Sequence, residues 1–589
     1  MKLLRLQIAQ DFRSLKAGFE LRFRDAAHLD SMQAFRPFCF AGLNGSGKSN
    51  VLEALANIFY HLDLCASRFK PRAFEKFFNP ANNINGPNAF ELEYLTFPKT
   101  GRGLADGYNR IRVIKEDKGV PKMFQTFYPF NTLEEQKEPT ETEIDLVADK
   151  DQKQAAEGKN YLPELVVGYS SGENEILSIP FIKSRLIHLD EYAESSARYL
   201  SEGLQFEQSE SSLTYIDSEM SQAVLLASLI FEDKKTTLKP LLRELRIKRL
   251  RSFRMHLNNR VLTVAKENKE IVHPLALDHL SEKINLLRQL ATSWFEEKTE
   301  GRGFGKDAEA CETSILILDF FVDDEMKEAF KGVFSSSLEM FQFFQLLYEL
   351  NNTFLETANI DSGIKEEVYK SEGFYTDGKL PVPGPAEKVF FFLNFYLEKY
   401  KYGSTTETDE LLLRNFSDGE HQFIHTMGIC LLIKNMRTIM LLDEPETHFN
   451  PDWRSQFISI LDESITAGGS NNLMTDVLLT SHSPFIISDC LPDNVIFFSR
   501  NRESRYVEAK TAKEMGFNTY GASVNYILKN FFNTEFLGSK SLNEMKRLIK
   551  EGSLDELTAA TERFSESGKK QFLYKRIFEL TNADESTED

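Results

Sequence analysis

The residues with the clearest chemical potential form a glycine-rich segment near the N-terminus, Gly42-Leu43-Asn44-Gly45-Ser46-Gly47-Lys48-Ser49. The segment fits the pattern G-x-x-x-x-G-K-S, in which backbone N–H groups and a helix N-terminus surround phosphates. A short apolar run at 38–41 precedes it and a helical apolar pattern at 51–59 follows it, which is the context the pattern requires. We therefore expect an ATP site that includes Asn44, Gly45, Gly47, Lys48, Ser49 and Asn50. The Lys48 ammonium would contact the β/γ-phosphates, and the Ser49 hydroxyl would ligate Mg²⁺.

An acidic pair follows a second apolar run, far along the chain. Residues 438–442 predict a buried strand, and Asp443 and Glu444 come directly after it. Ligands of α/β sheets bind at the carboxyl ends of the strands, so this pair would lie beside the phosphate loop. We expect Asp443 to hold Mg²⁺, directly or through water, and Glu444 to act as the base that polarises the attacking water.

Two further segments flank the acidic pair. Phe416-Ser417-Asp418-Gly419-Glu420-His421-Gln422 begins a helical pattern, with Ser417 26 positions before Asp443. Taken alone, it is also what an ordinary serine N-cap looks like. The run 478–480 predicts a strand that ends in Ser481-His482-Ser483-Pro484, and a lone histidine in such a place is usually structural.

Together and in this order, the four motifs resemble those of ABC-type ATPases. The resemblance implies that Ser417 and Gly419 bind the γ-phosphate of an ATP held by a second copy of the chain. It also implies that His482 contacts the γ-phosphate and positions the water. Lys48 and Asp443 are 395 positions apart, far more than in transporter cassettes, and such a split is characteristic of chromosome-maintenance, RecF-like and overcoming-lysogenization-defect (OLD) ATPases.

A finer resemblance concerns two other segments. Residues 444–451 are similar to the segment after the catalytic pair in the last two groups, which makes His448 and Asn450 candidates for communication between subunits. Turn capping explains both residues equally well. A second signature-like segment, Ser170 to Asn174, resembles one in ATPases of restriction-associated, Septu-type and retron-associated anti-phage systems. The glutamine that senses Mg²⁺ in ABC ATPases has several candidates, Gln125 among them.

The length of 589 residues predicts more than one structural unit. We expect an α/β fold: a P-loop ABC-type ATPase core with a mixed sheet and helices, split by a large, mostly helical insertion. The expected parts are an N-terminal core segment at 1–185, the insertion at 186–405, a C-terminal core segment at 406–510 and a helical region at 511–589.

The charge pattern bears on partners. The formal net charge is −19, which argues against tight nonspecific DNA binding by the whole surface. Lys239 to Arg260 is the main basic stretch, and we interpret it as a solvated helix, with a contact to nucleic acid or an acidic partner as the alternative. No apolar run approaches the ~18 residues of a membrane span, so we expect a cytoplasmic protein without a membrane partner.

The resemblance implies a homodimer or higher oligomer that closes on ATP. Our leading hypothesis is an anti-phage defence ATPase that controls a partner nuclease. The OLD family carries a Toprim nuclease domain, which needs an Asp-x-Asp pair, and none follows His482. The nuclease would therefore be a separate chain, of the HNH type in Septu-like systems. The alternatives are a RecF-like repair ATPase that binds DNA directly, and a scaffold that holds a reverse transcriptase with its RNA and DNA.

Overall fold

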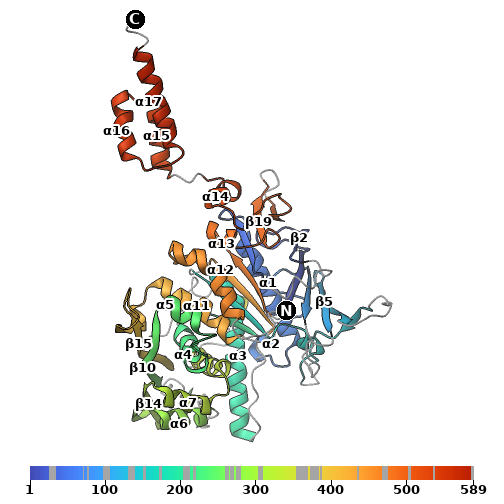
Figure 1. The fold of residues 1–589 in the computed structure, drawn as a ribbon. Coiled ribbons are helices and arrows are strands. Elements are labelled where there is room, and N and C mark those ends of the chain that lie inside the picture. The colour runs from blue at the N-terminus through green and yellow to red at the C-terminus, as the bar shows by residue number, and fades with distance from the viewer. Residues whose placement is uncertain are drawn as a thin grey trace. The chain divides into compact units, whose positions relative to one another are not determined.

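The chain folds around two sheets that share one central helix, with an inserted third sheet (Figure 1). The computed structural model describes residues 1–24, 35–70, 72–75, 78–96, 107–129, 140–149, 154–171, 175–202, 212–216, 220–258, 264–265, 271–272, 280–302, 310–352, 369–371, 384, 388–433, 437–466, 475–501, 506–534 and 538–585.

The first sheet has seven strands in the order β20-β19-β3-β18-β17-β8-β9 and is parallel except for β20. Its strands are β3 (Phe38–Gly42), β8 (Leu165–Ser170), β9 (Leu213–Tyr215), β17 (Thr438–Asp443), β18 (Thr475–Thr480), β19 (Val495–Arg500) and β20 (Val507–Thr511). Strands buried on both faces need nearly continuous apolar runs, and every residue of β3, β17 and β18 is buried. The register aligns Ser170, Asp443 and Thr480, so these strands end at one edge of the sheet.

The second sheet is antiparallel, in the order β2-β1-β4-β5-β6-β7. Its strands are β1 (Lys2–Ile8), β2 (Phe19–Arg22), β4 (Phe90–Thr96), β5 (Gly107–Lys115), β6 (Lys122–Pro129) and β7 (Thr142–Ile144). Helix α1 (Lys48–Ala66) leaves the glycine-rich loop, and all its residues from Val51 onwards are buried. One apolar core joins this helix to residues of both sheets. The expected α/β core is therefore confirmed.

The insertion is only partly helical. Its helices are α3 (Glu175–Glu202), α4 (Ser221–Phe231), α5 (Lys239–Leu245), α6 (Ser281–Leu290), α7 (Asp324–Val333) and α8 (Ser337–Glu349). An antiparallel sheet in the order β13-β14-β10-β15-β16 accompanies them, with the small pair β11 (Val264–Ala265) and β12 (Ile271–Val272). The five strands are β10 (Ile247–Asn258), β13 (Ser293–Arg302), β14 (Ala310–Phe321), β15 (Phe390–Tyr400) and β16 (Thr408–Leu412).

This sheet corrects the expectation of a mostly helical insertion. Short apolar runs do not distinguish a buried helix from a strand by periodicity alone, and the runs at 315–321 and 390–396 are of that kind. Phenylalanines hold the sheet to its helices. The Phe253 ring lies 4.8 Å from that of Phe320 and 5.8 Å from that of Phe392, and Phe330 of α7 joins them.

The basic stretch from Lys239 to Arg260 is also not a single helix. Helix α5 ends at Leu245, Arg246 adopts a left-handed backbone conformation with φ 54°, and β10 begins at Ile247. Pairing with β14 and β15 overrides the local helical pattern, because it places Leu250, Phe253 and Met255 in the core. Arg260 lies outside the described residues.

Further α-helices lie in the part of the chain that the structure describes. They are α2 (Arg72–Glu75), α11 (Asp418–Leu432), α12 (Pro451–Thr466), α13 (Pro484–Ser488), α14 (Val524–Phe532), α15 (Ser539–Glu551), α16 (Leu554–Arg563) and α17 (Lys570–Glu585). The chain divides into two compact units, Met1–Gly521 and Ala522–Asp589. The second unit has a small core of its own around Met545, Leu557 and Leu573. No helix in the described part of the chain is long and apolar enough to cross a membrane.

Candidate nucleotide site

The glycine-rich loop between β3 and α1 is a tight cradle. Gly42 has φ 145°, and a Cβ there would lie 2.4 Å from the Phe498 carbonyl oxygen. Gly47 precedes α1 with φ 103°, and a Cβ there would lie 2.9 Å from both Ser14 Oγ and a Val507 methyl carbon. Only glycine fits these conformations at such close approach. The loop is thereby fixed by its neighbours before any ligand arrives.

Two side chains of the loop fit the phosphates of ATP. Lys48 is buried, and its ammonium donates to the carbonyl oxygens of Gly42 and Leu43 at 3.0 and 3.2 Å. Burial lowers the pKa of Lys48, and the nearby carboxylates of Glu444 and Asp443 oppose that shift. The Ser46 hydroxyl is buried without a hydrogen-bond partner among the described residues. A buried orphan of this kind calls for a ligand, and a phosphate oxygen would satisfy it.

The acidic pair meets the loop at Ser49, and one threonine joins the two members of the pair. Ser49 Oγ donates to Asp443 Oδ1 at 2.9 Å, and Thr480 Oγ1 donates to the same oxygen at 2.7 Å. The same Thr480 hydroxyl accepts from the Glu444 N–H at 2.9 Å. Ser49 and Asp443 are oxygen ligands suited to Mg²⁺, which keeps waters and phosphate oxygens as its remaining ligands. The described residues hold no cluster of three or more His, Cys, Asp or Glu side chains that could bind a metal ion.

Glu444 stands in an unusual backbone conformation. Its φ is 48°, in the left-handed region that bulky residues rarely adopt, and the Thr480 hydrogen bond to its N–H helps hold it there. Its carboxylate lies 3.4 Å from His482 Nε2. The hydrogen bond from His482 lowers the pKa of Glu444, and the Lys48 ammonium acts in the same direction. The carboxylate is therefore ionised at neutral pH, as a general base must be.

His482 joins the acidic pair to the loop. Its Nε2 lies 3.1 Å from Lys48 Nζ as well as near Glu444. Lys48, Ser49, Asp443, Glu444 and His482 therefore meet at the edge of the parallel sheet. Of the other loop residues, Asn44 and Gly45 are exposed on its tip. Asn50 points elsewhere, because its amide oxygen accepts from Ser14 Oγ and its nitrogen donates to Glu53.

Sequence reasoning missed three residues of this site. Thr480 bridges Asp443 and Glu444, as described above. Ser481 donates a short hydrogen bond to Glu446, whose carboxyl is almost fully buried. Burial raises the pKa of Glu446 to about 7. In the sequence, Thr480 and Ser481 stand out only as a polar pair between the apolar run 477–479 and His482.

The signature-like segment begins α11. Ser417 is exposed and caps the helix: its hydroxyl accepts from the Glu420 N–H, while Glu420 accepts from the Ser417 N–H. Lys399 of β15 makes a short ion pair with Glu420, and its ammonium lies 4.1 Å above the Phe416 ring. Gly419 is needed for packing, since a Cβ there would lie 2.8 Å from the His448 carbonyl oxygen.

Ser417 and Gly419 make no hydrogen bond or ion pair with Lys48, Ser49, Asp443, Glu444 or His482 in the described structure. The N-terminus of α11 is open to solvent.

The other candidates lie in different settings. Asn450 caps α12 by accepting from the Trp453 N–H at 2.8 Å, and the His448 N–H donates to Gln422. Gln125 lies in the antiparallel sheet, where it donates to Asn109. Ser170 ends β8 beside Asp443, and the Ser171 N–H donates to the Asp443 carbonyl at 3.1 Å. The rest of that segment, Gly172 to Asn174, lies outside the described residues.

The sheet order, the loop and the convergent polar edge have the arrangement of a P-loop ATPase core. A family model agrees: residues 338–488, from α8 through the acidic pair to His482, match the family described as "AAA domain, putative AbiEii toxin, Type IV TA system". No curated protein matches the chain.

Two solved structures of the recombination mediator protein RecF in the RecFOR pathway are similar to the chain, one with ATPrS and one with ATP. Each is 10% identical. The first match covers 86% of this chain and 97% of the other, with a TM-score of 0.23. The second covers 82% and 94%, with a TM-score of 0.20. TM-scores this low do not establish a shared fold.

Proposed function

We propose that the chain hydrolyses ATP as the motor subunit of an anti-phage defence system, and that ATP-dependent dimer closure controls a separate nuclease chain. The observation that carries the ATPase part is the convergence of Lys48, Ser49, Asp443, Glu444 and His482 across 395 positions of sequence. Such a set of mutually bonded polar groups at a sheet edge is an arrangement for phosphoryl transfer to water.

Each residue has a distinct task in this proposal. Bound ATP would supply the phosphoanhydride bond that is cleaved, and its Mg²⁺ would neutralise part of the phosphate charge. Lys48 and the loop N–H groups orient the phosphates, and Ser49 and Asp443 hold the metal. Glu444 accepts a proton from the attacking water, and Thr480 keeps Asp443 and Glu444 in register. His482 contacts the Glu444 carboxylate and lies beside Lys48, from where it would contact the γ-phosphate of bound ATP.

A second copy would complete the site. Ser417 and the exposed N-terminus of α11 offer a hydroxyl, N–H groups and the positive end of a helix dipole. The acidic Glu420 beside them is paired with Lys399, which removes a negative charge that would repel phosphate. We infer a homodimer in which Ser417 and Gly419 of each copy contact the nucleotide of the other.

The defence role rests on the matched family description and on sequence resemblances. The matched family description names a putative toxin of a Type IV TA system, which is compatible with a defence role. The chain also resembles Septu-type and retron-associated ATPases at Ser170 to Asn174, whereas the segment after Glu444 resembles that of RecF-like and OLD ATPases. The proposed partner is an HNH-type nuclease, with a reverse transcriptase and its RNA and DNA as the alternative partner.

The test is expression of the chain together with its native gene neighbours, followed by size-exclusion chromatography with and without ATP and Mg²⁺. Co-elution of a nuclease or a reverse transcriptase supports the defence role. A chain that elutes alone, dimerises with ATP and hydrolyses it faster with DNA would contradict that role and favour the RecF-like repair function.

A further inference from the structure

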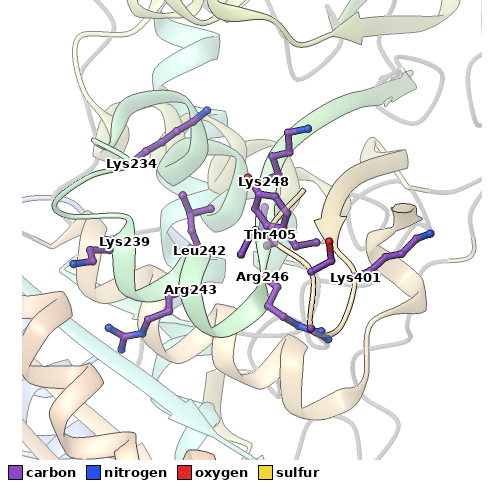
Figure 2. A pocket seen from close by; sticks show the side chains of 12 residues that line it. Lys234, Lys239, Leu242, Arg243, Arg246, Lys248, Lys401 and Thr405 are labelled. Atoms are coloured by element: carbon purple, nitrogen blue, oxygen red, sulfur yellow. The ribbon is translucent and has the colours of Figure 1, made fainter. Parts of the chain in front are cut away.

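A groove lined by positive charge lies in the insertion, where helix α5, the start of β10 and the loop between β15 and β16 meet (Figure 2). Its volume is about 770 Å³, and no acidic side chain is among the residues that line it. The basic residues that line it are Lys234, Lys239, Arg243, Arg246, Lys248 and Lys401. The chain has a net charge of −19, so this groove is a local reversal of the overall charge.

Half of these cations form no ion pair with any residue that the structure describes. Arg243, Lys248 and Lys401 form ion pairs with Glu244, Glu398 and Glu407. Across the described residues, by contrast, no ion pair involves Lys234, Lys239 or Arg246, and all three are exposed. Gathering unpaired like charges is unfavourable without a counter-charge, so the surface is arranged for an anion.

The positive surface extends beyond the groove, which favours a chain-like anion over a single phosphate. Lys327 of α7 lies near Lys234: burial lowers the pKa of Lys327, the positive charge of Lys234 lowers it further, and Asp324 opposes the shift. A track of cations along several elements is typical of a surface that follows a phosphate backbone.

An exposed aromatic ring flanks the track. Tyr402 is 93% exposed in the loop between β15 and β16, and the Arg246 guanidinium lies 5.1 Å from its ring centroid. Bases of single-stranded nucleic acid stack on tyrosine rings and on guanidinium planes. An acidic polypeptide has no bases that could stack in this way. Base pairs of a duplex are already stacked internally.

We propose that this groove, with Tyr402 at its rim, binds single-stranded nucleic acid through its phosphates and one stacked base. The groove is also joined to the nucleotide site. Lys401 lines the groove two residues after Lys399, whose ammonium holds Glu420 at the start of α11. Helix α5 itself packs against α11 and α12. Occupancy would therefore shift the Ser417 cap and change the ATPase rate. This second step rests on the proposed function; the binding step does not.

Binding is tested by fluorescence anisotropy with labelled 20-nucleotide single strands and the matching duplex over a range of salt concentrations. The purified full chain should prefer the single strand, with an affinity that falls steeply with salt. Lys234→Glu with Lys239→Glu should weaken binding at least about tenfold at low salt and flatten the log–log salt slope by at least about 1.4, since each contact to a single strand contributes about 0.7. Tyr402→Ala should weaken single-strand binding roughly 5- to 100-fold.

A matched control reverses two lysines of the separate C-terminal unit, Lys546→Glu with Lys550→Glu, and should bind as the unchanged chain does. Binding of a fluorescent ATP analogue should be normal in all variants, which shows that they fold. Absence of single-strand binding at low salt, or affinity unchanged by the Lys234/Lys239 reversal, overturns the proposal. So does displacement of the oligonucleotide by poly-glutamate at lower charge concentration than by unlabelled DNA, which would mark an acidic protein as the occupant.

The coupling step has its own readout, the rate of ATP hydrolysis with saturating single strands. A change of at least about twofold that is lost in the Lys234/Lys239 variant supports coupling. If single strands bind but the rate of ATP hydrolysis does not change, the proposed binding in the groove still holds and the proposed coupling is wrong. Failure to hydrolyse ATP at all would contradict the proposed function while the anisotropy result still stands.

Discussion

The nucleotide site and the basic groove differ in how their charges are balanced. At the edge of the parallel sheet, groups of both charge signs lie close together. His482 contacts both Lys48 and Glu444, and Ser49 and Thr480 both donate to one oxygen of Asp443. The groove, in contrast, is lined by positive charges alone. Lys234, Lys239 and Arg246 form no ion pair with any residue that the structure describes.

The difference shows what each region is built to bind. A site for a small ligand and a single reaction has its groups fixed in advance, which keeps the reorganisation cost low during chemistry. A surface for a flexible polyanion needs excess charge rather than fixed geometry, because the ligand brings its own counter-charge and adapts its shape. Lys399 stands between the two regions, since it belongs to the strand that leads into the groove and pairs with the cap of α11.

The largest effect is expected from removing the base of the fixed site. Glu444→Gln keeps the shape but not the proton acceptor, so turnover should fall by about 10³ or more while ATP stays bound. Rapid-quench hydrolysis assays and chromatography with ATP check this: the variant should accumulate as a closed dimer. Normal hydrolysis by this variant would show that Glu444 is not the base.

The next effect concerns the threonine that joins Asp443 to Glu444. Thr480→Val preserves volume but removes the hydroxyl, which frees the Glu444 N–H and strains the left-handed conformation. We expect kcat to fall about 10- to 100-fold, with the affinity for ATP changed far less. Thr480→Ser retains the hydroxyl and is the matched control. Equal kcat in the two variants would mean that the bridge does not position the acidic pair.

A smaller effect is expected at the residue between the two regions. Lys399→Met leaves Glu420 without its counter-charge beside Ser417, so kcat should fall roughly tenfold. ATP affinity of the isolated chain should stay within about twofold. Lys550→Met, in the C-terminal unit, is the control. If Lys399→Met instead lowers ATP affinity and leaves kcat alone, the ion pair does not serve the signature serine.

The smallest effect on turnover, but a clear one on stability, is expected at Glu446. Its folded pKa of about 7 lies above the ordinary 4.5, so its stabilising contribution is complete below about pH 4.5 and is lost as the pH rises through 7. Glu446→Gln mimics the protonated form. In urea unfolding, the free energy of unfolding of the variant should match that of the unchanged chain near pH 5. At pH 8 it should be higher by up to roughly 3 kcal/mol. The exposed Glu551→Gln should show no such pH dependence, and a similar pH dependence in both variants would refute the assignment.

The fold of the core could be predicted because its strands are apolar on both faces and its motifs carry fixed contexts. The runs at 38–41, 438–442 and 477–480 became β3, β17 and β18, and the helical run after Ser49 became α1. The insertion could not be predicted in the same way. Its strands are aromatic-rich and contain charged residues such as Arg249 and Arg254, whose partners Glu398 and Asp319 lie far away in sequence.

The sequence motifs named the five side chains that the structure brings together, Lys48, Ser49, Asp443, Glu444 and His482, but not the contacts that hold them. The role of Ser417 and Gly419 stays a prediction. Thr480 and Glu446 carry no signature of their own, because their roles depend on the register of β17 with β18. Asn50 was placed at the nucleotide by its position after Ser49, yet in the structure its side chain bonds Ser14 and Glu53. A local motif gives no information about such a distant partner.

The central claim is that each nucleotide site combines the loop and acidic pair of one chain with Ser417 of another. The most direct test mixes two inactive variants, Lys48→Ala and Ser417→Arg, and measures ATP hydrolysis. In a mixed dimer one of the two sites has an intact loop facing an intact signature, so a random mixture should recover about a quarter of the normal rate. A mixture as inactive as either variant alone, alongside an active unchanged chain, would contradict the account.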